Sequence, residues 1–512
     1  MAARVGIIDI GTSSIKLIIG EAAKDKIQVL EYLKNLVPVG KDVFYRSRIS
    51  PEATKQTVAI LEKYKKVIKE YDVATLKVIA TTAAREAENN DIFLDTIFRL
   101  TGLNVEVLTA GDVIYFLDAY LYNELKERYP IHSKNVLIVE LGSGNVDISL
   151  LEKGFTLMSV GLPLGPLRLR QLTAKLEGST LDVNEAVEQY VGKEIGFLKR
   201  YFPDIKIDDV IMIDENYSEY LRQISGLPEP GSKFFPVPRN FAEKMLRELH
   251  DRTPDEIASD YKVSPEYSDT ITAFSTIINS FIKTAEVEQI YMFEASLSEA
   301  ILANIALDYE ISSKYNKAGQ LLSLVRFICR KFNVDRPHSE HVAMIAEVFF
   351  ENLREQMGLK KSELLYLTLS AYLHDIGMSV SNRSHHKHSE YMINALNLFR
   401  LTDEEIKIIA CVARYHRKST PQDSHLLFKS LPREKQILVQ KLSAILRVAN
   451  SLDASHRQKI EKIEFNTGHR DHPVINLKVK DNFIFEKHEF YEKVMVLEEI
   501  IGNKILLKIM AD

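Results

Sequence analysis

Hydrophobic and polar positions follow two alternating patterns over the first 130 residues. Apolar runs with the length of β-strands lie at 5–8, 15–19, 27–33, 76–81 and 104–109. Longer segments with apolar residues at helical spacing lie at 51–71, 91–100 and 112–128. The first of these helices is expected to begin after Ser50, with Pro51 in its first turn. Strands that alternate with helices predict an α/β layer with a mostly parallel sheet.

The pattern then begins again. The segment "NVLIVELGSGNVDISLLEKG" (135–154) repeats the order of strand, Gly/Ser-rich turn and strand found in "RVGIIDIGTSSIKLIIGEAAKD" (4–25). This internal repeat predicts tandem α/β lobes over 1–127 and 128–308, with a cleft between them.

From residue 312 onward the period is helical. Apolar residues at helical spacing occupy 316–331, 336–357, 361–375, 388–399, 403–416 and 434–452. These segments predict an all-α domain over 312–455. The last segment, 456–512, combines strand-like runs with one helical stretch, which predicts a small α+β domain.

Composition narrows the class of protein. With 512 residues the chain exceeds a single hydrophobic core, and 46% hydrophobic with 27% charged residues is typical of a soluble globular protein. A net charge of −5 gives no overall field that attracts nucleic acid, and no apolar stretch reaches the roughly 18 residues of a membrane span. Cys329 and Cys411 lie in apolar helical patterns, which predicts buried thiols in a reducing cytoplasm. We therefore expect a cytoplasmic protein with neither a membrane nor a nucleic-acid partner.

The segment "AYLHDIGMSV" (371–380) places His374 beside Asp375 in an otherwise apolar stretch. A hydrogen-bonded core pair is one explanation. Similar residues recur in or next to other predicted helices, however: His338, His385, His386, His388, His416 and Asp453. Imidazole and carboxylate groups suit a transition metal or magnesium, and a bound ion would offset the cost of burying charge. We expect a metal site here, with a metal-free remnant of such a site as the alternative.

The turns of the repeated segments carry a second candidate site. The first strand ends at Asp9 and is followed by Gly11, Thr12, Ser13 and Ser14. Backbone N–H groups and hydroxyls in such a turn can hold a phosphate, and the aspartate can hold a magnesium ion or its water. A plain β-hairpin turn explains one copy equally well. The second copy, with Glu140, Gly142, Ser143 and Gly144, favours phosphate binding.

The histidines and aspartates of the helical part resemble the HD metal-dependent phosphohydrolase superfamily. The resemblance implies that His338, His374, Asp375 and Asp453 bind a metal. It also implies that His416 and either His385 or His388 serve a second metal or bind phosphate, and their spacing does not choose between the last two. The metal would supply a hydroxide nucleophile and neutralise phosphate charge.

Four further segments extend a family likeness over nearly the whole chain: "GIIDIGTSSIKLIIG" (6–20), "VIATTAAREAENN" (78–90), "VELGSGNVDISL" (139–150) and "LPLGPLRL" (162–169). They resemble the exopolyphosphatase/guanosine pentaphosphatase (Ppx/GppA) family of the actin–hexokinase, ribonuclease H-like fold. The resemblance implies lobes that clamp a phosphate chain, with Arg85 in the cleft. It also implies a divalent metal (Mg, Mn or another transition metal) and a ligand that is inorganic polyphosphate or guanosine penta- or tetraphosphate.

The chain departs from the family pattern at positions that matter for catalysis. Val113 stands where the family has its glutamate, and a valine cannot act as a general base. Asp112 lies one position early, and Asp147 stands in place of a glutamate in the second loop. Asp214 and Glu215 lie where the family has a Gly-Gly-Thr motif. We expect Asp112, Glu140 and His416 to be the catalytic residues, and Asp147 to lie beside the phosphate.

These observations predict a Ppx/GppA-type phosphohydrolase acting on phosphoanhydrides, with an eroded N-terminal active site. One alternative is an HD-type phosphohydrolase whose lobes only bind a nucleotide or polyphosphate. Another is a binding or regulatory protein without turnover. The catalytic domain, the metal and a homodimeric state stay open.

Overall fold

The computed structural model describes residues 3–510 except 25, 177–182, 202–204, 216, 219, 222–231, 263–264, 269, 308–315, 397, 399–400, 418 and 467–472. The chain divides into two compact units, Met1–Gln320 and Leu321–Asp512. The predicted end of the second lobe and start of the all-α domain, 308–312, lies outside the described residues.

The first sheet of the N-terminal unit has the strand order β3-β2-β1-β4-β5. Its strands are β1 (Val5–Ile10), β2 (Ser14–Ala23), β3 (Lys26–Leu36), β4 (Thr75–Ala80) and β5 (Glu106–Val107). The sheet is mixed rather than mostly parallel as predicted. β2 pairs antiparallel with both β1 and β3, whereas β4 pairs parallel with both β1 and β5. The short turn after β1 leaves no room for the crossover that a parallel pair needs.

Helices cover this sheet. They are α1 (Val39–Arg46), α2 (Pro51–Glu70), α3 (Thr82–Glu86) and α4 (Asn90–Thr101). As expected, Ser50 caps α2 by accepting a hydrogen bond from the Ala53 amide at 3.2 Å.

The second sheet has the order β10-β11-β9-β6-β7-β8. Its strands are β6 (Asn135–Leu141), β7 (Val146–Glu152), β8 (Phe155–Leu162), β9 (Asp209–Asp214), β10 (Phe234–Pro238) and β11 (Gln289–Glu294). β6 pairs antiparallel with β7 and parallel with β9, so the arrangement of β1, β2 and β4 recurs. The other elements of this lobe are η1 (Ile131–Ser133), α6 (Pro166–Leu176), α7 (Val183–Ile195), α8 (Phe197–Tyr201), α10 (Arg239–His250), α11 (Pro254–Tyr261), α12 (Pro265–Ser268) and α13 (Ile271–Ala285).

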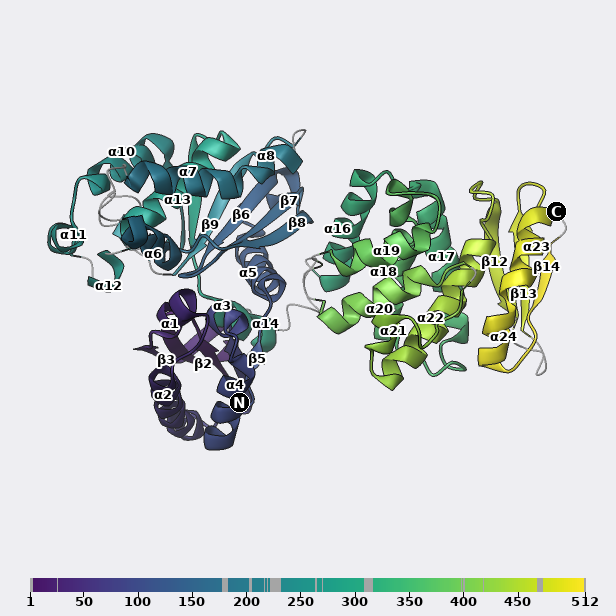
Figure 1. The fold of residues 1–512 in the computed structure, drawn as a ribbon, viewed down its shortest axis with the longest axis horizontal. Helices are drawn as coiled ribbons and strands as arrows, with labels where there is room; N and C mark the ends of the chain where they lie inside the picture. Colours follow the sequence, from purple (N-terminus) through teal and green to yellow (C-terminus); the bar gives the residue numbers. More distant parts are fainter. Residues whose placement is uncertain are drawn as a thin grey trace. The chain divides into compact units, whose positions relative to one another are not determined.

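Two helices join the lobes, because each packs on the sheet of the other lobe. α5 (Ala110–Leu125), which follows the first sheet in the chain, packs on β6, β7 and β8 of the second sheet. α14 (Leu297–Ala306), which follows the second sheet, packs on β1, β2 and β3 of the first. The two helices also contact each other (Figure 1). This exchange brings the β1–β2 and β6–β7 turns to one cleft.

The C-terminal unit is helical. The first turn of α16 (Lys317–Lys331) still belongs to the N-terminal unit, and the rest of this helix begins the C-terminal unit. The elements that follow are α17 (Arg336–Leu353), η2 (Lys361–Glu363), α18 (Leu364–Leu373), η3 (Ile376–Ser379), α19 (His385–Asn394), α20 (Asp403–Arg414), α21 (Leu426–Lys429) and α22 (Arg433–Ser451). α22 is central, because it packs on α17, α18 and α20 and buries most of its apolar residues.

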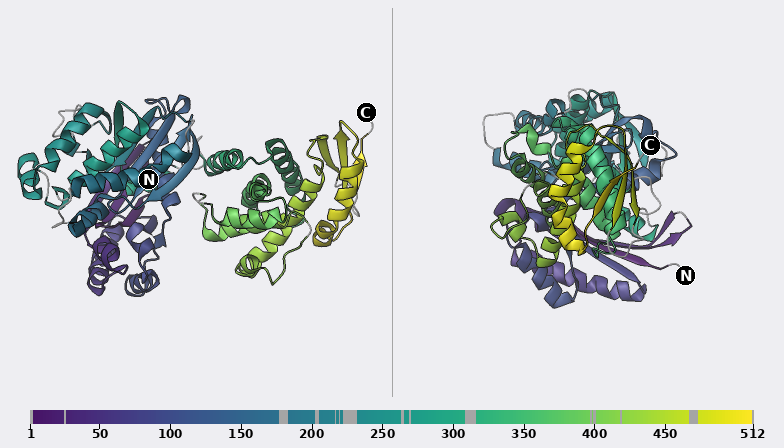
Figure 2. Two further views of the ribbon diagram at one scale, coloured as in Figure 1. Left: turned by 45° about the horizontal axis from the view of Figure 1, so that its top comes forward. Right: turned by 90° about the vertical axis from the view of Figure 1, so that its right-hand side faces the viewer.

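The chain ends in a small α+β layer that packs on α22. The three-stranded sheet has the order β12 (Ile460–Asn466), β13 (Val474–Val479) and β14 (Leu506–Ile509). The helices α23 (Ile484–Lys493) and α24 (Met495–Ile501) pack on α22, and β12 contacts α17 (Figures 1 and 2). Lys459 and Glu486 form a buried ion pair at 2.9 Å that ties the start of this layer to α23.

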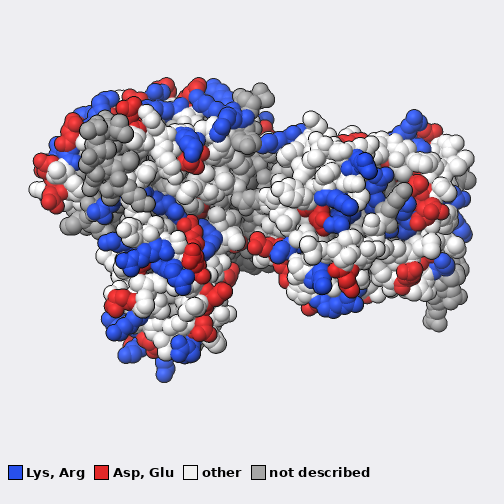
Figure 3. All heavy atoms as spheres, viewed as in Figure 1, with Lys and Arg blue, Asp and Glu red and all other residues white. Residues whose placement is uncertain are grey.

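Surface charge is mixed in sign. On the face shown in Figure 3, acidic and basic side chains are interspersed over the described parts of both units. No helix among the described residues is long and apolar enough to cross a membrane.

Candidate functional site

The two Gly-rich turns face each other across the cleft of the N-terminal unit. Ser13 Oγ of the first turn lies 3.3 Å from Ser143 Oγ of the second. The first turn is tight, because the Gly11 amide donates to the Ser14 carbonyl at 2.9 Å. In the second turn a side chain at Gly144 would overlap the Phe44 ring of α1. The predicted turn residues thus line one cavity of about 100 Å³.

Carboxylates outnumber lysines in this cleft. Its lining includes Asp9, Glu140, Asp147, Asp214 and Glu215, together with Lys16 and Lys34. Lys16 pairs with Glu215, whose other oxygen accepts a hydrogen bond from the Tyr32 hydroxyl at 2.7 Å. Asp9 Oδ1 is buried and accepts no hydrogen bond from the residues that the structure describes. This set of oxygens fits a hard divalent cation such as Mg²⁺.

Burial perturbs the acids of the β6–β7 hairpin. Burial and then the charge of Asp147 raise the pKa of Glu140 well above its usual value. Burial also raises the pKa of Asp147 to about 7, against the opposing effects of Arg85 and Asn145. Without a cation these carboxyl groups therefore hold protons at a pH where most carboxyl groups are ionised.

Residues predicted for catalysis around α5 are placed differently from the expectation. Asp112 is the third residue of α5, where its Oδ2 accepts hydrogen bonds from the Thr109 amide at 3.0 Å and hydroxyl at 2.7 Å. This capping box uses the carboxylate, so the structure does not bring Asp112 into the cleft. The cleft is lined instead by Val113 and Leu117 of the same helix.

Arg85 also differs from its predicted place. Its Nη1 donates to the Leu108 carbonyl at 2.7 Å, and its Nη2 lies 3.3 Å from Thr82 Oγ1. The guanidinium acts on the cleft through its charge, which lowers the pKa of Asp147.

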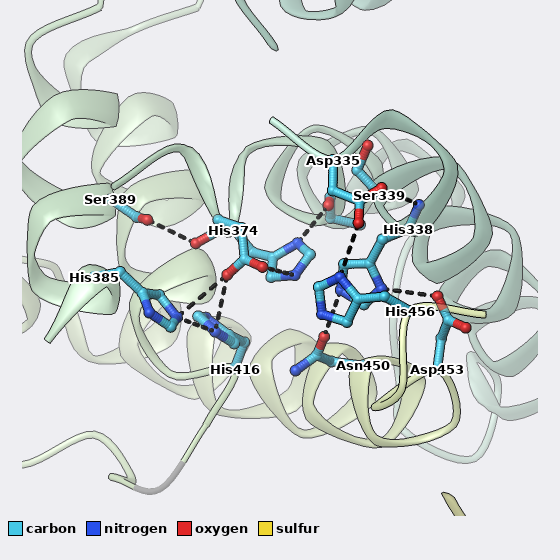
Figure 4. Close-up of polar contacts among 12 residues, drawn as sticks. Asp335, His338, Ser339, His374, His385, Ser389, His416, Asn450, Asp453 and His456 are labelled. Atoms are coloured by element: carbon cyan, nitrogen blue, oxygen red, sulfur yellow. Dashed lines mark hydrogen bonds and ion pairs between the residues drawn. The ribbon is translucent and has the colours of Figure 1, made fainter. Parts of the chain in front are cut away.

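In the C-terminal unit the side chains of His374, His385 and His416 lie together (Figure 4). All three imidazoles contact the Asp375 carboxylate. His374 and His416 donate Nδ1–H to the carbonyls of Ala371 and Ala413, at 2.7 and 2.6 Å. His385 does the same to the Asn382 carbonyl at 3.2 Å. In each case the partner lies three residues earlier, which aims Nε2 at the carboxylate. The Nε2 atoms lie 3.5, 3.6 and 3.2 Å from Asp375 oxygens for His374, His416 and His385.

This arrangement calls for a positive charge at its centre. The Nε2 atoms of His385 and His416 are 3.3 Å apart, and neither can donate to the other while both imidazoles are neutral with Nδ1 protonated. His374 Nε2 is buried and has no hydrogen-bond partner among the described residues. Burial lowers the pKa of His374 and, most strongly, of His416. Burial opposes ionisation of Asp375, but His374, His385 and His416 hold its pKa well below the usual range.

A second group of potential ligands shares Asp375. Ligand atoms of His338, Asp375 and His456 lie within 4.8 Å of one another, as do those of His374, Asp375 and His416. His338 stacks on His456 with ring centroids 3.6 Å apart. His338 Nδ1 lies 2.8 Å from Asp453 Oδ2, and His456 Nδ1 lies 2.9 Å from Asp335 Oδ2. Carboxylates behind imidazole ligands are typical of metal sites.

The structure therefore refines the predicted ligand set. Neither His385 nor His388 belongs to the two ligand groups among the described residues. His385 Nε2 nevertheless lies 3.2 Å from Asp375 Oδ1, whereas no hydrogen bond or ion pair joins His388 to Asp375 among those residues. Asp453 lies behind His338, and its Oδ1 accepts from the Gln458 amide at 2.7 Å. His456 was missed, although it stands three residues after Asp453. Its left-handed backbone, with φ of 56°, places it where helical spacing does not predict it.

Comparisons with known proteins agree with this architecture. The sequence profile of the Ppx/GppA phosphatase family matches residues 17–308, and that of Ppx/GppA phosphatase domain III matches 323–495. The chain belongs to the Ppx/GppA phosphatase family. The predicted family and the predicted phosphohydrolase type are thus confirmed.

Similar curated proteins match either nearly the whole chain or only part of it. A guanosine-5'-triphosphate,3'-diphosphate pyrophosphatase of Pseudoalteromonas translucida is 21% identical over 93% of this chain and 92% of its own length. A bifunctional 3-dehydroquinate synthase/phosphatase of Fusobacterium nucleatum is 27% identical, over 32% of this chain and 25% of that protein.

Solved structures show the same fold over about three fifths of the chain. The Ppx/GppA family member of Aquifex aeolicus has a TM-score of 0.52 at 20% identity, covering 60% of this chain and 99% of that protein. An exopolyphosphatase of Cytophaga hutchinsonii has a TM-score of 0.52 at 18% identity, covering 61% and 99%. The prediction of actin-like α/β sheets followed by a helical region is confirmed.

Proposed function

We propose that this Ppx/GppA phosphatase hydrolyses phosphate bonds at a divalent-metal centre of HD type in its helical unit. One observation carries the proposal: the Nε2 atoms of His374, His385 and His416 converge on Asp375 while their Nδ1 atoms are held by backbone carbonyls. If these histidines only stabilised the fold, their buried Nε2 acceptor atoms would have no reason to face one another.

The donor set fits a transition metal such as Mn²⁺ or, with fewer imidazoles, Mg²⁺. His374, Asp375 and His416 would hold one ion, and His338, Asp375 and His456 a second. A cation held there would supply a nucleophilic hydroxide near neutral pH and would neutralise phosphate charge. The chain itself orients the ligands: Asp453 holds the His338 ring, and the Ser389 hydroxyl donates to the His374 carbonyl at 2.6 Å.

The N-terminal cleft, on this proposal, binds a phosphate chain and is a poor catalyst. Its turns and acidic residues suit a complex of Mg²⁺ with inorganic polyphosphate or guanosine penta- or tetraphosphate, the kinds of ligand that the names of the relatives suggest. Val113 offers no proton acceptor at its place in the cleft, and loss of a general base typically costs about 10²–10⁴-fold in rate.

The decisive experiment compares two full-length variants. Asp375→Asn removes a charge from the helical cluster, and Glu140→Gln removes one from the cleft, with nearly equal volume in each case. We expect Asp375→Asn to lose bound Mn²⁺ by metal analysis and to abolish phosphate release from tripolyphosphate and guanosine pentaphosphate. Glu140→Gln should retain most of that release. The reverse pattern would exclude the helical unit as the catalytic centre.

Hydrolysis in the N-terminal cleft is the second candidate. The raised pKa of Glu140 favours it, because a carboxylate shifted toward neutral pH is a better general base. If neither variant changes activity because the wild type releases no phosphate, while ligand still raises the unfolding temperature, the chain is a binding protein.

Cellular location and domain limits belong to the same proposal. The reduced, buried Cys329 and Cys411 support a cytoplasmic location. The boundaries 1–127, 128–308, 312–455 and 456–512 stay predictions, as does a homodimer.

A further inference from the structure

A cavity of about 390 Å³ opens beside the histidine cluster of the helical unit. This size falls within the range of pockets for small organic ligands, roughly 300–1,000 Å³. One wall is formed by Asp375, His385, His416 and His456 of the proposed metal centre. A ligand in this cavity would therefore touch the proposed reaction site.

A second wall comes from one face of α23. Phe485, Glu489 and Lys493 follow at intervals of four residues, so they lie along the same side of the helix, and all line the cavity. Lys459 and Ser455 both contact Glu486, which is buried on another side of α23 and fixes the rotation of the helix. The small C-terminal layer thereby presents Phe485 to the cavity.

The lining combines cationic and flat apolar groups. Arg417 follows His416 directly, and Arg447 and Lys493 add further positive charge. Arg447 Nη2 donates to the carbonyls of Tyr415 and Ser419, so that guanidinium is held in place. Lys493 Nζ lies 3.6 Å from Glu489, the acid that this wall contributes.

The Phe485 ring adds an aromatic surface to the cavity lining. It is 52% exposed although it lines a cavity, and Met378, also exposed, lines the same cavity. An exposed aromatic ring beside cations is suited to stack on a nucleobase.

We infer that this cavity takes a nucleoside phosphate, with its base on Phe485 and its phosphates toward Arg417, Lys493 and the histidine cluster. The inference rests on the proposed function and adds the substrate class of that site. An inorganic phosphate chain would use the cations but would leave the aromatic ring without a partner.

The chain contains no tryptophan, which allows a local fluorescence reporter. Phe485→Trp in the full-length protein places a single indole at the cavity. Ile484→Trp is the matched control, because Ile484 is adjacent, 75% exposed and outside the cavity lining. We expect ADP or GDP with Mn²⁺ to quench Phe485→Trp saturably, and inorganic pyrophosphate to leave its emission unchanged. Neither ligand should quench Ile484→Trp beyond simple absorption.

A kinetic pair extends the test. Phe485→Ala should raise KM for nucleotide hydrolysis about tenfold, the scale of one lost base–aromatic stack, and leave pyrophosphate hydrolysis unchanged. Ile484→Ala should change neither.

The two proposals fail in different ways. Equal quenching by pyrophosphate, or no quenching by either nucleotide, overturns the nucleotide inference even if Asp375→Asn abolishes hydrolysis. Saturable quenching by nucleotide, without quenching by pyrophosphate, supports the nucleotide inference. This holds even if Asp375→Asn leaves hydrolysis intact, a result that would contradict the proposed metal centre.

Discussion

At the residue scale, the proposed function makes Val113 the position at which the N-terminal cleft lacks a general base. Val113 is buried and lines the cleft one helical turn after the Thr109 cap. We expect Val113→Glu, in an Asp375→Asn background, to raise phosphate release from tripolyphosphate at least tenfold, since a general base is worth about 10²–10⁴-fold. A malachite-green assay measures the rate of phosphate release. Val113→Gln has the same shape without a base, and an equal gain in that control would contradict the explanation.

At the element scale, the contact between η3 and α19 holds His385 beside Asp375. A side chain on Gly377 would overlap the His385 carbonyl and the Ser389 amide, and it would come within 2.8 Å of His388 Cβ. We expect Gly377→Ala to lower the free energy of unfolding by about 1–3 kcal/mol, the usual cost of overpacking, and to reduce bound metal. Denaturant unfolding and metal analysis measure the two effects. Gly192→Ala, where a methyl group meets no described atom within 4 Å, should cost nothing.

The β6–β7 hairpin should make stability depend on pH. The folded chain keeps protons on Glu140 and Asp147 that the unfolded chain releases near its usual pKa of about 4. The contribution of these groups to the free energy of unfolding is therefore present at low pH and is lost as pH rises from about 4 through 7. Thermal unfolding without divalent ions should show a lower midpoint at pH 8 than at pH 5.5. Asp147→Asn should flatten this difference, and Mg²⁺ should oppose it; an unchanged profile in the variant would refute the assignment.

At the scale of the whole molecule, the two compact units should unfold as separate transitions in calorimetry. Mn²⁺ at 100 times its Kd stabilises a binding unit by about 2.7 kcal/mol. We expect Asp375→Ala to remove the metal-induced shift of one transition, and Asp9→Asn to reduce that of the other. A single transition, shifted equally in both variants, would show that the units do not bind metal separately.

Local sequence patterns determined much of this protein. Periodicity placed most strands and helices, because each depends on which face of a short segment is apolar. The spacing of glycine and hydroxyl residues located both turns of the cleft, and the order of His374, Asp375 and His416 along the helices located the second site. The register of the segment around Val113 predicted that the cleft has no glutamate at this position.

Only the tertiary structure decided which of these side chains meet. Asp112 has the chemistry of a base, but a capping box at the start of α5 occupies it. The contact of His385 rather than His388 with Asp375, and the place of His456 in a ligand group, depended on turns whose backbone angles periodicity does not encode. The exchange of α5 and α14 between sheets, and the orientation of Phe485 by the buried Glu486, arise from contacts between segments distant in sequence. A local pattern specifies what each segment buries, whereas the packing of distant segments specifies what each polar group faces.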